Sequence, residues 1–136
     1  TLSGVFHCMR AELAAMTAAG GGAIVNNASI AGIVGFPTIA PYAAAKHGVI
    51  GLTQTAALEY AGRGIRVNAI CPGYMDTPMT HAATTPEMRN ALAASAPIGR
   101  LGLPGEAAEL AVWLCSPAAS YVNGAFVPVD GGVVAG

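Results

Sequence analysis

Residues 29–46 read S-I-A-G-I-V-G-F-P-T-I-A-P-Y-A-A-A-K, a serine, a loop containing Gly and Pro, and then an alanine-rich segment that ends in lysine. Tyr42 and Lys46 are four residues apart, so on a helix they lie on one face, one turn apart. Lys46 is the only lysine in the chain. A cation about 5 Å from a phenol, at an effective dielectric of about 20, favours the phenolate by roughly 3 kcal/mol.

Such a pair is suited to proton transfer near neutral pH, and Ser29 offers a hydroxyl that could hold a substrate oxygen beside the phenol. The alternative interpretation of the same residues is an amphipathic helix with a surface lysine and a half-buried tyrosine. The five-residue pattern alone does not decide between the two.

The flanking sequence predicts helices that alternate with strands. An apolar stripe at three- and four-residue steps predicts a helix that Gly20 to Gly22 end; its members are Leu2, Val5, Met9, Leu13 and Met16. Short apolar runs predict strands at 23–28, 65–71 and 125–129. Further helices are expected from near Pro41 to about Gly62, from Thr85 to about Ala94 and from Pro104 to Ser116.

This alternation favours an α/β fold with a parallel sheet and right-handed crossovers. Pro128 lacks a backbone donor, which places the last strand at a sheet edge. Ligands of such sheets bind beyond the carboxyl ends of the strands. We therefore expect Ser29, Pro72-Gly73 and the Tyr42/Lys46 face to converge there.

Composition narrows the class of protein. The chain has 136 residues, enough for one domain, of which 54% are hydrophobic and 10% charged, with a mean hydropathy of +0.55. So few charges predict that other chain or other subunits cover much of the surface. A net charge of −1 without a basic cluster argues against binding to nucleic acid or acidic membranes, and Gly, Pro and polar residues interrupt every run that could span a membrane.

The cysteines and histidines give no sign of a disulfide or a metal site. The three cysteines (Cys8, Cys71 and Cys115) are far apart and are predicted to be buried thiols in a reducing, cytoplasmic compartment. The three histidines (His7, His47 and His81) share no ligand spacing, so no metal is expected. The sequence shows no signal peptide and begins inside a helical pattern without Met, from which we expect a fragment or a chain whose start is not represented.

Several ordered segments together resemble the short-chain dehydrogenase/reductase family. They are I-V-N-N-A-S-I-A-G (24–32), Tyr42-x-x-x-Lys46, I-R-V-N-A-I-C-P-G-Y-M-D-T-P-M (65–79), P-I-G-R-L-G-L-P-G-E-A-A (97–108) and V-P-V-D-G-G (127–132). The resemblance covers nearly the whole chain and about the second half of a family member. It implies that 1–136 is the C-terminal catalytic portion of a Rossmann-type domain, with about three strands and without the N-terminal dinucleotide-binding half.

The resemblance also implies hydride transfer between NAD or NADP and an alcohol or ketone. In that mechanism Tyr42 is the general acid/base, Lys46 favours its phenolate and binds the nicotinamide ribose, and Ser29 positions the substrate oxygen. The implied cofactor-binding residues are Tyr42, Lys46, Pro72, Gly73, the backbone of Met75, and Thr77. The implied partners are a small-molecule substrate and a second copy of the chain, packed through small-residue helix faces.

The chain also departs from the family pattern. It shows no Gly-rich turn after a first strand and no residue that selects NAD over NADP, and Thr1 stands where the family has an asparagine. An inactive fragment or a non-catalytic assembly module is therefore the alternative function. A hydrolase with Ser29 as nucleophile lacks the G-x-S-x-G motif. Substrate contact is predicted for Tyr74 and for an apolar lining of Ile33, Val34, Phe36, Met75 and Met79.

Overall fold

Three parallel strands form the centre of the computed structural model, which describes residues 2–136. The strands are β1 (Gly22–Asn27), β2 (Ile65–Pro72) and β3 (Phe126–Val129). They pair in the order β1-β2-β3, with Gly22 opposite Ile65 and Ala69 opposite Phe126. The parallel sheet is confirmed, and so is the prediction that Pro128 lies in an edge strand.

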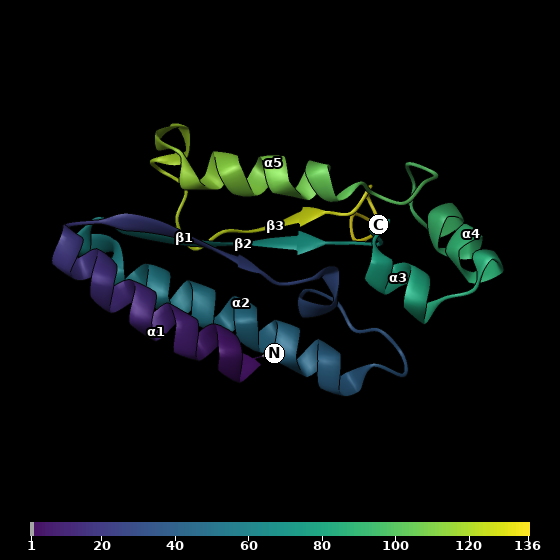
Figure 1. Cartoon of the computed structure of the whole chain (residues 1–136), viewed down its shortest axis with the longest axis horizontal. Helices are drawn as coiled ribbons and strands as arrows, with labels where there is room; N and C mark the ends of the chain where they lie inside the picture. The colour runs from purple at the N-terminus through teal and green to yellow at the C-terminus, as the bar shows by residue number, and fades with distance from the viewer. Residues whose placement is uncertain (1) are drawn as a thin grey trace.

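Helices cover both faces of the sheet (Figure 1). Helices α1 (Leu2–Ala19) and α2 (Ala40–Tyr60) pack on one face, and α5 (Pro104–Cys115) packs on the other. Two shorter helices, α3 (Pro78–Ala83) and α4 (Pro86–Ser95), lie beyond the carboxyl end of β2. Single 3-10 turns occupy Ile30–Gly32, Ala61–Arg63 and Pro117–Ala119.

The local sequence explains where these elements begin and end. Gly64, with a φ of 72°, makes the left-handed turn that leads from the end of the α2 segment into β2. The hydroxyl oxygen of Thr85 accepts a hydrogen bond from the Met88 N–H and caps α4, as its position predicted. The predicted stripe on α1 is also correct, since Met9 and Leu13 are its buried residues.

The core consists of a larger layer under α1 and α2 and a smaller one under α5. The first contains Met9, Leu13, Ile24, Ala28, Val49, Ile50, Ala56, Ala57, Ile65, Val67, Ala69 and Cys71, and the second contains Ile70, Ala107 and Leu114. Strand β2 lies between the two layers and has five fully or nearly fully buried residues in succession, from Val67 to Cys71. Apart from Asn68, whose amide hydrogen-bonds to the backbone of Val122 and Ala125, these residues are apolar, as expected for a strand covered on both faces.

The structure corrects some expectations from the sequence. Cys71 is buried as predicted, whereas Cys8 and Cys115 are exposed. Helix α3 lies before α4, in a segment for which the sequence predicts no helix. Thr1 lies outside the described residues. Among the helices of residues 2–136, none combines the length and apolar character that crossing a membrane requires.

Candidate active site

Ser29 lies two residues after the last residue of β1, at the carboxyl edge of the sheet. Its hydroxyl oxygen accepts a hydrogen bond of 3.1 Å from the Ala31 N–H, and so caps the 3-10 turn that follows. The side chain is buried and lines a cavity. Because the oxygen acts as acceptor in this cap, the O–H hydrogen of Ser29 remains available to a ligand.

Lys46 and Tyr42 lie on the same face of the first half of α2, as their spacing predicted. The Lys46 ammonium is 5.6 Å from the centre of the Tyr42 ring and donates a hydrogen bond of 2.8 Å to the carbonyl oxygen of Asn27. Lys46 is buried, and this burial lowers the pKa of its ammonium below the usual value. Tyr42 is 42% exposed and lines the same cavity as Ser29.

Gly32 allows the serine segment to lie close to α2. A Cβ atom at this position would be 2.7 Å from the Lys46 carbonyl oxygen and 2.9 Å from the carbonyl carbon. Both atoms belong to the backbone, so neither can rotate away. The missing side chain is therefore what permits the short distance between the Ser29 turn and the helix that carries Tyr42 and Lys46.

Gly73, at the end of β2, likewise allows two backbone segments to lie close together. A Cβ atom there would be 2.7 Å from Cβ and 2.9 Å from Cα of Asp130, in the turn after β3. Asp130 holds that turn through hydrogen bonds from the N–H groups of Gly132 and Val134 to its carboxylate. The ends of β2 and β3 are thus packed backbone to backbone beside the cavity.

The cavity has a volume of about 410 Å³. It lies between the Ser29 turn, the N-terminal end of α2, the end of β2, and the helices α3 and α4. Its lining consists of Ser29, Ile30, Ala31, Phe36, Ile39, Tyr42, Gly73, Tyr74, Met75, Met79, Thr80, Ala83, Thr84 and Leu92. The structure therefore brings Ser29 and Tyr42 to one space, together with Gly73 and Met75 from the predicted cofactor-binding set.

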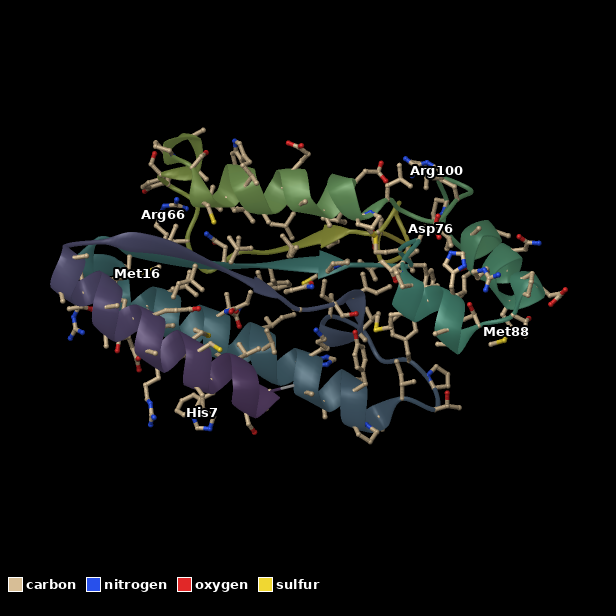
Figure 2. All side chains as sticks on the ribbon, viewed as in Figure 1. His7, Met16, Arg66, Asp76, Met88 and Arg100 are labelled. Carbon is tan, nitrogen blue, oxygen red and sulfur yellow. The ribbon has the colours of Figure 1, made fainter. Side chains whose placement is uncertain are left out.

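The remaining predicted site residues lie behind or beside this space. Lys46 stands behind Tyr42, and Pro72 is the last residue of β2, next to Gly73. Thr77 accepts a hydrogen bond from the Thr80 N–H and caps α3. Asp76 directly precedes this cap and pairs with His81 of α3; Figure 2 labels Asp76.

The apolar lining differs in part from the prediction. Phe36, Met75 and Met79 line the cavity, but Ile33 packs against the core beside Val49, and Val34 is outside the lining. Ile39 and Leu92 also line the cavity; both lie in the segments 30–40 and 74–96 that the sequence suggests as the pocket, although neither is predicted individually. The sequence does contain a signal for α3: Thr77 is a capping residue, and Pro78 after it occupies the first helical position. This signal could have predicted the part of the cavity wall that α3 forms.

The arrangement can bind and protonate an oxygen. Two hydroxyls, on Ser29 and Tyr42, share one cavity, and a buried ammonium stands behind the phenol. A substrate oxygen within hydrogen-bonding distance of both hydroxyls would accept hydrogen bonds from both. Within residues 2–136, no three His, Cys, Asp or Glu side chains cluster as a metal site would require.

Comparisons with known proteins give a consistent result over nearly the whole chain. The family model described as "Enoyl-(Acyl carrier protein) reductase" matches residues 1–134. Cyclohexanol dehydrogenase of Acinetobacter sp. is 52% identical over 130 residues, which are 96% of this chain and 50% of that protein. Cis-4-hydroxycyclohexanecarboxylate dehydrogenase of Sinomonas cyclohexanicum is also 52% identical, over 134 residues that are 98% of this chain and 53% of that protein.

A solved structure of the same fold carries a nucleotide. The crystal structure of a gluconate 5-dehydrogenase from Burkholderia cenocepacia, in complex with NADP and tartrate, superposes with a TM-score of 0.92 at 36% identity. The match covers 98% of this chain and 52% of that chain. The present chain thus spans about half the length of the relatives it matches.

Proposed function

Because this chain belongs to the short-chain dehydrogenase/reductase family, we propose that its protein transfers a hydride between NAD(P) and an alcohol or ketone. Members of the family are oxidoreductases and use NAD(P), as the dehydrogenase relatives and the NADP complex show. The observation that carries the proposal is the shared cavity of Ser29 and Tyr42 with the Lys46 ammonium directly behind the phenol. We propose that residues 1–136 form the catalytic portion of one Rossmann-like domain.

In the direction of ketone reduction, Tyr42 is the proton donor. When bound, the reduced nicotinamide would supply a hydride to the carbonyl carbon, and the electron pair of the C=O double bond would then move to the oxygen. That oxygen takes the proton of the Tyr42 phenol, which becomes a phenolate. The Lys46 ammonium, 5.6 Å from the ring centre, stabilises this anion. In the oxidation of an alcohol, the phenolate accepts the proton instead.

Ser29 holds the reacting oxygen in place. Its O–H hydrogen is free to donate because its oxygen is the acceptor in the cap of the following turn. A donor at this position stabilises the negative charge that develops on the carbonyl oxygen as the hydride arrives. The buried turn, packed on α2 through Gly32, keeps the donor in the same place before and after the reaction.

Lys46 has donors left for the nicotinamide ribose. An ammonium has three N–H hydrogens, and one of them is bound to the Asn27 carbonyl oxygen. A buried ammonium with remaining donors fits a ligand with hydroxyl groups, such as a ribose. We propose that Lys46 and Tyr42 hold the ribose, and that Pro72, Gly73, the Met75 backbone and Thr77 line the nicotinamide end.

The test is the oxidation of NADH or NADPH by the intact protein with ketone substrates, followed by nicotinamide absorbance. We expect Tyr42→Phe to lower kcat by about 10² to 10⁴, the usual contribution of a general acid. Tyr121→Phe is the matched control, because Tyr121 is fully exposed and outside the cavity, and it should leave kcat unchanged within twofold. Equal activity of the two variants would refute the role of Tyr42.

The outer surface of α1 and α2 favours a second copy of the chain as partner. Phe6 is 47% exposed there and lines a shallow groove with Gly51 and Leu52. Gly48, another small residue of α2, lines the same groove, and the side chain of Leu2 of α1 lies close to it. We expect Phe6→Glu to weaken this contact between copies, so that analytical sedimentation gives a lower molecular mass for the assembly. Val112→Glu, on α5, should leave the mass of the assembly unchanged. A protein that assembles but neither binds nor oxidises NAD(P)H would favour the assembly function instead.

A further inference from the structure

We infer that the substrate of this site is a neutral molecule with a hydrocarbon body and a single oxygen function, the one that reacts. The inference rests on the proposed function and narrows its substrate class. Two relatives of equal identity, 52%, have names that point to different substrates, one a neutral ring and the other a ring that carries a carboxylate. The inference decides between these two kinds of substrate for the present site. Charge, hydrogen bonding and the apolar walls of the cavity support it independently.

The first argument is the absence of charge in the lining. None of the fourteen residues that line the cavity in the described part of the chain is an Asp, Glu, Lys, Arg or His. Arg89 on α4 approaches the wall from outside, and its guanidinium is bound to the carbonyl and hydroxyl oxygens of Thr84. Asp76 and His81 pair with each other outside the lining. A carboxylate in this cavity would lose water without gaining a counter-ion.

The second argument is the small number of free donors. The Thr80 hydroxyl donates a hydrogen bond of 2.7 Å to the Met75 carbonyl oxygen, and the Thr84 hydroxyl donates to the Thr80 carbonyl oxygen. A hydroxyl has a single hydrogen, so neither threonine can donate to a substrate. Among the side chains that line the cavity in the described part of the chain, the hydroxyls that remain are those of Ser29 and Tyr42, which serve the reacting oxygen, and of Tyr74. A polyol would leave most of its oxygens without a protein donor.

The third argument is the character of the wall opposite the hydroxyls. Phe36 and Ile39 come from the loop before α2, Met79 from α3 and Leu92 from α4, so hydrocarbon side chains of three segments face one space. A volume of about 410 Å³ is within the range of cavities that hold small organic ligands, which leaves room for a cyclic hydrocarbon. Displacing water from apolar walls favours an apolar body.

Three ketones with one ring and one variable substituent test the inference in the intact protein with NADH or NADPH. They are cyclohexanone, its methyl derivative at the carbon opposite the carbonyl, and the derivative with a carboxylate at that carbon. The methyl ketone controls for size. We expect kcat/KM for both neutral ketones to exceed that for the carboxylate by at least about tenfold. A carboxylate within threefold of the methyl ketone would overturn the inference and leave the proposed function intact.

Binding gives a readout that does not depend on turnover. With methionine methyl groups labelled with carbon-13, Met75 and Met79 report on the cavity, whereas Met9 and Met16 pack around the α1 face of the core. The methyl ketone should shift the resonances of Met75 and Met79 and leave those of Met9 and Met16 in place. The carboxylate should shift none at the same concentration. Equal shifts caused by the methyl ketone and the carboxylate would contradict the inference, even if the protein reduces neither compound. Failure to reduce any of the ketones would count against the proposed function alone.

A pair of exposed methionines provides the matched variants. Met79 and Met88 are both exposed, but only Met79 lines the cavity, and Met88 lies at the outer end of the molecule on α4 (Figure 2). We expect Met79→Gln to lower kcat/KM for the methyl ketone by roughly three- to tenfold, because a polar side chain replaces part of the apolar wall. Met88→Gln should change it less than twofold. Equal kcat/KM values for Met79→Gln and Met88→Gln would show that Met79 is not part of the wall that contacts the substrate.

Discussion

Replacing Gly32 with alanine should damage both the stability of the fold and the reaction, through one contact. The new Cβ atom would be 2.7 Å from the Lys46 carbonyl oxygen, about 0.7 Å short of the 3.4 Å at which ordinary contact begins. Because the contact atom is backbone, the Ser29 turn must move away from α2. Overpacking of this kind typically costs about 1–3 kcal/mol of unfolding free energy.

The same movement separates the hydroxyl of Ser29 from the groups on α2. A misplacement of about 1 Å can cost 10²-fold in rate, so a shift of about 0.7 Å should lower kcat/KM by roughly 10- to 100-fold. The assays are urea unfolding and steady-state reduction of a neutral cyclic ketone by the intact protein. The expected signature is a loss in both measurements for Gly32→Ala.

Gly35→Ala is the control for this experiment. Gly35 lies in the same loop, three residues further on, and an added Cβ would meet no atom within 4 Å. Its unfolding free energy should stay within about 0.5 kcal/mol of the wild type, and its kcat/KM should be unchanged. The reasoning is refuted if the two alanine variants are indistinguishable. A loss of stability with full activity would show that the turn does not set the position of the Ser29 hydroxyl.

Three further predictions concern stability, each measured as the unfolding free energy in urea. Leu114→Ala should cost about 2–5 kcal/mol because Leu114 is fully buried between α5 and the sheet. Leu58→Ala, at an exposed position of α2, should stay within about 0.5 kcal/mol, and equal effects of the two variants would contradict the assignment of the core. The Arg100 guanidinium, with a backbone N–H, lowers the pKa of Glu106 from 4.5 to about 2. Since the pKa of Glu106 is lower in the folded state than in the unfolded state, its contribution to the unfolding free energy is present above pH 4.5 and is lost as the pH falls towards 2. The unfolding free energy of Glu106→Gln should therefore be below that of the wild type at pH 6 and approach it near pH 2. A difference that stays constant with pH would be inconsistent with the Arg100–Glu106 pair. Thr38 adopts a φ of 69°, which is unfavourable for a β-branched residue, and Thr38→Asn should stabilise the fold by up to about 1 kcal/mol, a gain that would be missing if the loop relaxes in solution.

The positions of the strands and long helices could be predicted because each has a regular apolar period or a clear terminator. The spacing of Tyr42 and Lys46 also determined their common face of α2. The 3-10 turn after Ser29 has no such period, which is why Ile33 was wrongly assigned to the cavity and instead packs on the core. Helix α3 has six residues, too few for a periodic signal, so only its cap could have revealed it.

Other features of the site have no signature in the sequence at all. The partner of Lys46 is the backbone carbonyl oxygen of Asn27, and any residue type could supply this acceptor. The commitment of the Thr80 and Thr84 hydroxyls to backbone carbonyls likewise depends on local geometry. The exposed Cys8 and Cys115 show the limit of an argument from composition, because Cys8 lies off the apolar stripe of α1 and Cys115 is the last residue of α5.

The site draws on separate stretches of sequence, and this has a consequence for engineering. The proposed proton donor, its neighbouring ammonium and the serine come from residues 29–46, and residues 73–75 follow β2, whereas the wall formed by α3 and α4 comes from 78–95. These helices lie beyond the sheet and contribute no residue to its core. A chimaera that receives residues 78–95 from another member of the family should therefore acquire a new preference among ketones while it retains its own proton-transfer groups.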